Sequence, residues 1–251
     1  MSGHSKWSTI KRKKAAKDAK RGQLFTKLIR EITIAAREGG DPERNFKLRL
    51  AIDKAKMANM PKENIERAIK RGTGELKGRE LEEITFEGYG PHGVAMLIQV
   101  LTDNRNRAVA DVRRVLTRKG GSLGESGCVA WLFEPKGYIT IAADSDPDEI
   151  ALMAIDAGAE DVTVGSDLVE VFTRVDDFQA VKESLERNGV TLESAEISMI
   201  PKSLTHLNEE ETIQVMELID ALEELEDVKQ VYSNLDISDE IMAKYEAEAA
   251  G

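Results

Sequence analysis

The spacing of apolar residues changes at Leu81, where a helical period gives way to a period of two. Upstream, the apolar side chains between Phe25 and Ala36 recur every three or four positions, as in an amphipathic helix. Downstream, Ile84 and Phe86, and then the run 94–100, alternate as in strands that bury one face. No single type of element fits both periods. The chain is therefore predicted to combine a helical part with a part built on sheets.

Three helices are predicted in the first part. The first runs from Gln23 to the Gly39-Gly40 pair, and the third begins at Pro61 and ends at Gly72. The second is predicted to begin at Asp41-Pro42, with Asp41 as the N-cap. Its inward positions are Phe46, Leu50, Ala51, Ala55 and Ala58, and its outward cations are Arg44, Lys47, Arg49, Lys54 and Lys56.

The second part is predicted to form two α+β domains. A hairpin, a helix over Arg105–Lys119, a glycine-rich loop and a strand at Val129–Phe133 give the order ββαβ. Residues 135–201 then follow the ferredoxin-like order βαββαβ, and a helix and a strand after Pro201 complete the interrupted domain. The predicted fold class is α+β, with an N-terminal helical domain followed by two ferredoxin-like domains, one inserted in the other. The predicted domains are 1–79, 80–134 plus 202–251, and 135–201.

Charge is distributed unevenly along a chain whose formal net charge is −11. Residues 1–79 contain 22 Lys and Arg against 9 Asp and Glu, a net charge of +13, whereas residues 80–251 carry −24. A basic part binds polyanions through phosphate contacts and counterion release, and an acidic part is repelled by them. This separation predicts a partner that is a polyanion, bound in one orientation.

The strongest basic segment is the basic arm, which we define as residues 6–21. It holds eight Lys or Arg and one acid, Asp18. A solvated helix face is the alternative interpretation, but the uninterrupted basic run at 11–14 favours nucleic acid. The candidate nucleic-acid-binding residues of the arm are Lys6, Trp7, Lys11, Arg12, Lys13, Lys14, Lys17, Lys20 and Arg21. Trp7 has two open interpretations, stacking on an exposed base or covering the helical core.

A second basic segment coincides with the predicted helix over Arg105–Lys119, whose net charge is +5. Arg107, Arg114 and Arg118, at spacings of seven and four, share one helix face. This face is either a second phosphate-contacting surface or a solvent face paired with nearby acids. The candidate binding residues of this segment are Arg105, Arg107, Arg114 and Arg118.

The glycine-rich loop 120–127 follows a helix and precedes a strand, the reverse of a phosphate-binding loop, and it has no Gly-Lys-Ser/Thr. Its Gly-x-x-Gly match at 121–124 is too short to indicate RNA binding. We expect it to cap the preceding helix and turn the chain. The acids Asp144, Asp146 and Asp148 lack the Gly and Glu of a calcium loop and are expected to cap the helix that Pro147 begins.

Other classes of function are disfavoured by the residues present. The single Cys128 allows no internal disulfide, and three scattered His give no zinc-ligand spacing. No nucleophile elbow, zincin helix or paired-carboxylate signature is present, so an enzyme, a cofactor and a small-molecule substrate are not expected. No apolar run has the length of a membrane span or a signal-peptide core. The prediction is a cytoplasmic protein without a membrane partner.

Five segments resemble, in order, the signature segments of the YebC/PmpR family: Gly3–Trp7, Phe25–Ile32, Met60–Ile69, Gly88–Pro91 and Thr102–Arg107. The resemblance spans essentially the whole chain. It implies a helical domain followed by two α+β domains, and a cytoplasmic transcriptional regulator that binds DNA. The same family includes the mitochondrial translational activator of cytochrome c oxidase.

The resemblance leaves the polyanion open. Some bacterial members of the family are similar to ribosome-associated factors that bind ribosomal or transfer RNA and relieve stalling at proline-rich stretches, so this role is the alternative. The sequence has no evident recognition helix with base-reading residues, which weakens promoter specificity. A third possibility is an interaction module that binds no nucleic acid, but it leaves the basic arm unexplained.

Overall fold

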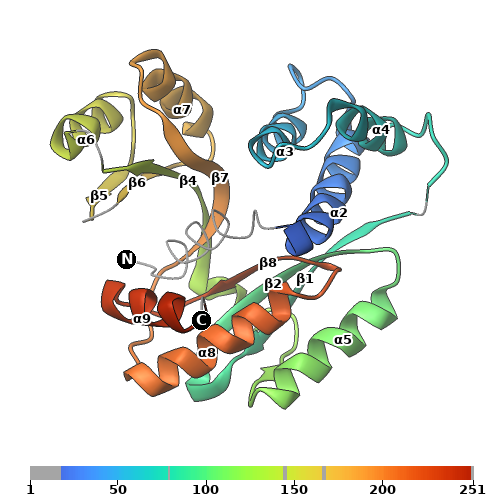
Figure 1. Ribbon diagram of the computed structural model, residues 1–251, viewed down its shortest axis with the longest axis vertical. Coiled ribbons are helices and arrows are strands. Elements are labelled where there is room, and N and C mark those ends of the chain that lie inside the picture. The colour runs from blue at the N-terminus through green and yellow to red at the C-terminus, as the bar shows by residue number, and fades with distance from the viewer. Residues whose placement is uncertain (1–17, 79, 144–145, 166–167, 250–251) are drawn as a thin grey trace. The chain divides into compact units, whose positions relative to one another are not determined.

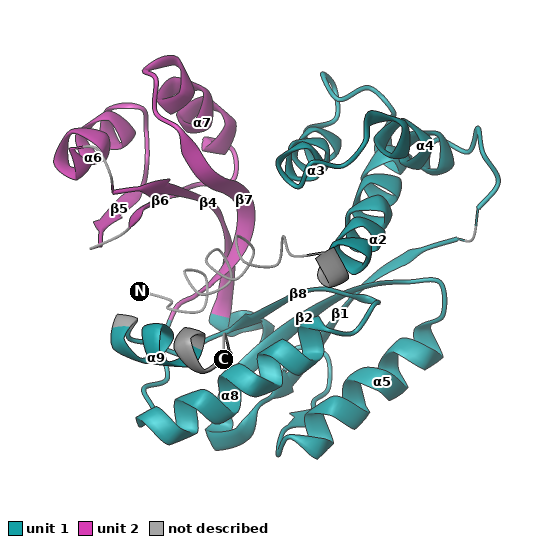
Figure 2. Ribbon diagram, viewed as in Figure 1, with its two compact units in different colours: residues 1–132, 203–251 teal, residues 133–202 magenta. Residues whose placement is uncertain are grey.

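The structure is a computed structural model that describes residues 18–78, 80–143, 146–165 and 168–249. The chain divides into two compact units (Figure 2): unit 1 comprises Met1–Leu132 and Ser203–Gly251, and unit 2 comprises Phe133–Lys202. Unit 2 is thus inserted between the two segments of unit 1. The division of unit 1 into a helical domain and a discontinuous α+β domain stays a prediction, which its two separate hydrophobic cores support.

The helical part of unit 1 contains α2 (Asp18–Ala35), the short helix η1 (Ala36–Glu38), α3 (Phe46–Met57) and α4 (Lys62–Gly72) (Figure 1). Their core is formed by Leu28, Ile32, Leu48, Ile52, Ala55, Ile65 and Ala68, among others. The last residue of α4 packs very closely on α2. A Cβ at Gly72 would lie 2.3 Å from the Thr33 carbonyl oxygen, so only glycine fits at this crossing.

The predicted start of the second helix at Asp41-Pro42 is wrong, because residues 42–44 form a turn and α3 begins at Phe46. Asn45 is its N-cap: the side-chain oxygen accepts a hydrogen bond from the Leu48 N–H at 3.0 Å. The Asn45 amide also donates to the carbonyl oxygens of Ala35 and Gly39, both at 2.7 Å. The buried face of α3 therefore contains Leu48 and Ile52, whereas Phe46 and Leu50 are partly exposed.

The sheet of unit 1 is antiparallel, with strand order β3-β1-β2-β8. Its elements in chain order are β1 (Glu82–Tyr89), η2 (Pro91–Gly93), β2 (Ala95–Thr102), α5 (Arg105–Arg118), β3 (Ser122–Leu123), α8 (Glu209–Glu223) and β8 (Val228–Ser233). Helices α5 and α8 lie on one face of this sheet (Figure 1), where they share its apolar core. A further helix, α9 (Asp239–Ala249), packs on α8 and was not predicted.

The predicted strand at Val129–Phe133 is wrong. Residues 130–132 form a short helix, η3 (Ala130–Leu132), and the strand that follows begins only at Phe133. In the sheet of unit 1, the position expected for the strand at Val129–Phe133 is taken by β3, which pairs with Gly88 and Tyr89 of β1. A two-residue strand has no period that could be recognised in the sequence.

Unit 2 has the ferredoxin-like order that was predicted. Its elements are β4 (Phe133–Ala142), α6 (Pro147–Asp156), β5 (Asp161–Val164), β6 (Leu168–Thr173), α7 (Phe178–Arg187) and β7 (Leu192–Pro201). The strands form an antiparallel sheet in the order β5-β6-β4-β7, so β5 and β7 are its edges. The predicted α+β class, with N-terminal helices and two sheets, is confirmed.

Candidate nucleic-acid interface

Helix α2 is joined to the sheet of unit 1 by charged side chains. The Arg30 guanidinium lies 2.7 Å from an Asp227 carboxylate oxygen and donates to the Glu226 carbonyl at 2.9 Å. Lys27 donates to the carbonyl oxygen of Glu223. The side chains of Arg30 and Asp227 are 15% and 10% exposed, so little water competes for this ion pair.

Asp227 also binds a residue of the second predicted basic segment. Arg107 donates to both of its carboxylate oxygens, at 3.1 and 2.8 Å, and Thr102 donates its hydroxyl at 2.9 Å. Arg107 pairs in addition with Asp103 at 2.8 Å. These carboxylates raise the pKa of Arg107, chiefly through the hydrogen bonds with Asp227. One carboxylate therefore connects α2, α5 and the start of β8.

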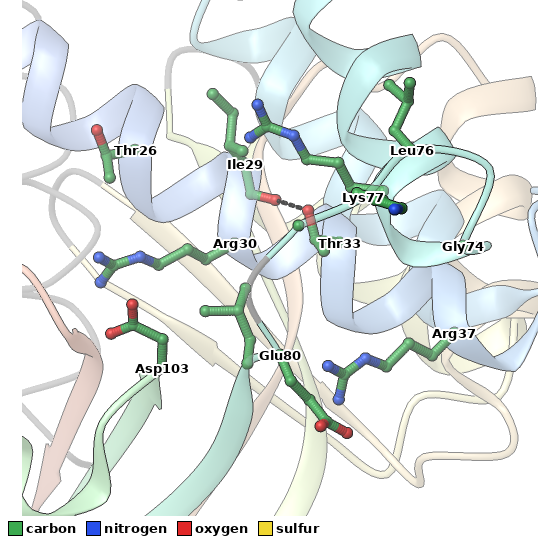
Figure 3. A pocket seen from close by; sticks show the side chains of 13 residues that line it. Thr26, Ile29, Arg30, Thr33, Arg37, Gly74, Leu76, Lys77, Glu80 and Asp103 are labelled. Atoms are coloured by element: carbon green, nitrogen blue, oxygen red, sulfur yellow. Dashed lines mark hydrogen bonds between the residues drawn. The ribbon is translucent and has the colours of Figure 1, made fainter.

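Beside this junction lies a cleft of about 700 Å³, which we call the α2–α4 cleft. Figure 3 shows its walls, which are formed by α2, the end of α4 and the segment that leads from α4 to β1. Its charged lining residues are Arg30, Arg37, Arg71, Lys77, Glu80 and Asp103. Thr33 fixes one wall, because its hydroxyl bonds the carbonyl oxygens of Ile29 at 2.7 Å and Ala68 at 3.3 Å.

Three cations of the α2–α4 cleft have no ion-pair partner within the described part of the chain. Arg37, Arg71 and Lys77 are all exposed, and no carboxylate of a described residue lies within ion-pair distance of them. The same holds for Arg67 and Lys70 on α4. Arginine presents a planar set of donors that matches phosphate oxygens, and lysine adds a point charge. The cleft can therefore receive phosphate groups without breaking an existing ion pair.

The cations of α3 and of the first turn of α4 differ in this respect. Lys47 pairs with Glu38 at 2.7 Å, Lys56 with Asp53 at 3.9 Å and Lys62 with Glu66 at 3.6 Å. Lys54 pairs with Glu31, and Arg49 donates to the carbonyl oxygens of Pro42 and Glu43. The outward cations predicted on the second helix are thus largely neutralised by neighbouring groups. Sequence alone could not separate these paired cations from the cations of the α2–α4 cleft that have no ion-pair partner among the described residues.

Most of the predicted basic arm lies outside the described residues. Lys6, Trp7, Lys11, Arg12, Lys13, Lys14 and Lys17 precede Asp18, and the Lys20 side chain is not described. Arg21 is described at the start of α2, exposed, with its guanidinium carbon 5.3 Å from the centre of the Phe25 ring. This distance allows a cation–π contact within the helix.

The four predicted arginines of α5 divide into two pairs. Arg107 is bound to Asp227 and Asp103, and Arg114 pairs with Asp111 at 3.0 Å, so the ion-pair interpretation describes both. Arg105 and Arg118 are exposed and have no carboxylate partner among the residues with described side chains. The helix therefore does not present one continuous face of free arginines.

The glycine-rich loop caps α5, as predicted. Gly120 has a φ of 80°, and the N–H groups of Gly120 and Gly121 donate to Thr117 and Leu116, the hydrogen bonds of a Schellman motif. Farther along, the Glu87 carboxylate accepts N–H bonds from Gly127, Val129 and Ala130 at 2.6, 2.9 and 2.7 Å. Those donors are occupied within the chain, so they form no open phosphate cradle.

Two side chains of this region, Cys128 and Glu87, have shifted pKa values. Burial, followed by the Glu87 charge, raises the pKa of Cys128. Burial alone would raise the pKa of Glu87 as well, but the three backbone donors together outweigh it and the pKa is lowered. His92 lies in η2, between β1 and β2, with Nε2 2.9 Å from the Gln214 side-chain oxygen.

Of the three acids expected to cap the helix at Pro147, Asp144 lies outside the described residues and Asp148 is an exposed residue of the helix itself. Asp146 caps α6, because its carboxylate accepts from the N–H groups of Asp148 and Glu149 at 3.1 and 3.3 Å. Among the residues described, no group of three His, Cys, Asp or Glu is arranged to hold a metal ion. Likewise, no described helix combines the length and the apolarity needed to cross a membrane.

The cleft residues Arg37, Arg71 and Lys77 were not predicted as a group. Lys70 and Arg71 in the last turn of α4, together with Lys77, form a further basic stretch. The local density of Lys and Arg could have indicated it as a candidate binding segment. Arg37 is 34 positions before Arg71, so only the packing of α2 on α4 brings them to one cleft.

Comparison with known proteins agrees with the resemblance along the whole chain. Residues 5–75 match the TACO1/YebC protein N-terminal domain, and residues 81–235 match the TACO1/YebC second and third domain. A probable transcriptional regulatory protein of Dehalococcoides mccartyi strain 195 is 56% identical over 251 residues, covering 99% of this chain and all of its own. Another so named, from Persephonella marina, is 55% identical, covering 97% and 99%.

A solved structure is also similar. The crystal structure of a conserved hypothetical protein from Aquifex aeolicus has a TM-score of 0.82 and 50% identity, covering 88% of this chain and 93% of that one. Both the fold and the sequence are thus shared along most of the chain. The protein belongs to the TACO1/YebC family.

Proposed function

We propose that this protein is a cytoplasmic regulator of gene expression that binds DNA through its basic helical part. The observation that carries the proposal is the set of cleft cations without carboxylate partners in the described chain, Arg37, Arg71 and Lys77. They belong to the same part of the sequence as the basic arm, where the net charge over residues 1–79 is +13. The names of the relatives, probable transcriptional regulatory proteins, support a regulatory role.

The chemistry of the cleft favours phosphate contacts over base reading. Its exposed cations have long side chains that can reach the DNA backbone, and backbone contacts position a protein without reading sequence. Each phosphate neutralised by a cation releases counterions, so the logarithm of the binding constant falls by about 0.9 per contact for each tenfold rise in salt. The proposal therefore predicts binding that is strongly dependent on salt.

The test is a triple substitution, Arg37→Gln, Arg71→Gln and Lys77→Gln, measured by fluorescence anisotropy with a labelled DNA duplex at several salt concentrations. If each side chain contacts one phosphate, the slope of log K against log salt becomes shallower by about 2.7. The matched control is Lys47→Gln, Lys56→Gln and Lys62→Gln, which removes the same charge from cations that already pair with acids. We expect the control to weaken binding much less.

Equal losses in the two triple variants would mean that only net charge matters, and the α2–α4 cleft would not be the binding site. A second measurement addresses the nature of the polyanion: purified ribosomes compete with the labelled duplex at physiological salt. Displacement of the DNA by ribosomes at much lower concentration than by unlabelled duplex would contradict the DNA proposal and place the regulator in translation.

A further inference from the structure

Helix α6 of unit 2 carries two large aliphatic side chains on its solvent side. Leu152 is 68% exposed and Ile155 is 50% exposed. They are three positions apart and therefore lie on one helix face, opposite to the buried residues Ile150 and Ala154. The neighbouring strand β5, against which α6 packs, is an edge of the sheet and exposes Val164 at 45%.

This apolar pair lies in a strongly anionic stretch of the chain. Between Lys136 and Arg174 the sequence contains nine Asp and Glu and no Lys or Arg. Three of the acids, Asp148, Glu149 and Asp156, are on α6 itself and are exposed, and no described cation forms an ion pair with them. The side chains of these three acids and of Leu152 and Ile155 make up what we call the α6 face.

We propose that the α6 face docks a cationic amphipathic helix of a partner protein. Apolar residues of that helix, three or four positions apart, would contact Leu152 and Ile155, and its Lys or Arg residues would pair with the surrounding acids. Docking of an apolar helix face in this way is a common mode of peptide recognition. Complementary charge around an apolar centre sets the choice of partner and the rate of association.

The charge of the α6 face disfavours the other occupants. Nucleic acids and anionic lipid surfaces carry the same sign of charge and are repelled. A second copy of the chain that used the same face in a two-fold dimer would bring Asp148, Glu149 and Asp156 against their own equivalents. A cationic protein segment is the class that satisfies both the apolar and the charged parts of this surface.

The experiment uses the full chain and a labelled synthetic peptide of leucine and lysine, with leucines at positions i, i+3 and i+7 of a helix. The control peptide has the same composition in scrambled order. Binding is measured by fluorescence anisotropy at physiological salt. We expect the amphipathic peptide to bind and the scrambled peptide to bind about tenfold more weakly or worse, because truncating central contacts commonly costs that much.

The variant that tests the apolar part is Leu152→Gln with Ile155→Gln, which keeps good helix formers on α6. We expect an affinity loss of about tenfold or more. The matched control is Val175→Gln, a residue of unit 2 outside α6 that is 38% exposed, and it should leave the affinity unchanged. A second variant, Asp148→Asn with Glu149→Gln and Asp156→Asn, should weaken binding and remove much of its salt dependence. Circular dichroism confirms that each variant is folded.

Three results would overturn the proposal. The first is an absence of peptide binding by the unmodified chain, and the second is equal binding of both peptides. The third is unchanged affinity in the folded Leu152→Gln/Ile155→Gln variant. Sedimentation provides a further check. If the chain binds no peptide but self-associates, and the Leu152→Gln/Ile155→Gln variant does not, the α6 face binds a second copy of the chain and the proposal is wrong.

Discussion

Replacing Asp227 by Asn tests whether one carboxylate holds α2 and α5 to the sheet of unit 1. The substitution keeps the size of the side chain and its hydrogen bond from Thr102, and it removes the charge that Arg30 and Arg107 share. A hydrogen bond between charged groups contributes about 1.5–3 kcal/mol, against about 0.5–1.5 kcal/mol for a neutral one.

Neither arginine is left without an acceptor in this variant. Arg30 still has the carbonyl oxygens of Leu101 and Glu226, and Arg107 still has Asp103. The cost is therefore smaller than the several kcal/mol of a fully orphaned buried charge. A loss of about 1 kcal/mol for each arginine lowers the free energy of unfolding by about 2 kcal/mol.

The assay is urea denaturation followed by far-ultraviolet circular dichroism. Among the described helices, only α6 and α7 belong to unit 2, so the signal chiefly follows the unfolding of unit 1. The matched control is Asp111→Asn on α5, whose partner Arg114 has a side chain that is 71% exposed. An ion pair this exposed contributes roughly 0–1 kcal/mol, and the control should change stability little.

The result that refutes this reasoning is a loss for Asp227→Asn no larger than that for Asp111→Asn. Salt gives a second criterion, since exposed pairs are screened and largely buried ones are not. The difference between the two variants should therefore persist at about 1 M salt. Its disappearance there would show that the Asp227 contacts behave as a solvated surface pair.

Two further predictions concern single residues of unit 1. The backbone donors hold the pKa of Glu87 below its usual value. The ionised Glu87 carboxylate therefore adds to the free energy of unfolding at pH values above its unfolded pKa of about 4.3, and this stabilisation is lost as the pH falls through the lower folded pKa. Urea midpoints measured in acid should thus fall more steeply for the unmodified chain than for Glu87→Gln, and parallel curves would contradict this. Gly72→Ala should destabilise unit 1 by about 1–3 kcal/mol, since the new Cβ would meet the Thr33 carbonyl at 2.3 Å, whereas Gly22→Ala, with nothing within 4 Å, should not. Thermal melting of the two variants compares them directly.

The long elements of this fold could be predicted from sequence because their periods are long enough to recognise. The helix over Arg105–Arg118 follows from apolar spacing over its whole length. The order of unit 2 follows from strands of alternating pattern that are separated by two helices of ten residues each. Shorter features depended on side-chain contacts that no period encodes. Asn45 rather than Asp41 begins α3 because its amide bonds three backbone groups at once, and β3 has only two residues.

The proposed binding site could be predicted from sequence only as a concentration of positive charge. Composition identifies the basic part of the chain, but it does not say which cations already have partners. The structure pairs Lys47 with Glu38 and Arg107 with Asp227, and it leaves Arg37 and Arg71 without a carboxylate in the described part of the chain. Pairing depends on distances of a few ångströms between residues that are far apart in sequence.

The sequence by itself determined the α+β class, the family and the separation of positive from negative charge, because these depend on local period, on residue identity and on simple counts. The tertiary structure decided which positive charges are free of carboxylate partners in the described part of the chain and so available to bind a polyanion. Asp227 neutralises Arg30 and Arg107 from different elements, and the packing of α4 on α2 brings Arg37 to Arg71 at one cleft. Electrostatic energy depends on distance and burial in space, and neither is fixed by position along the chain.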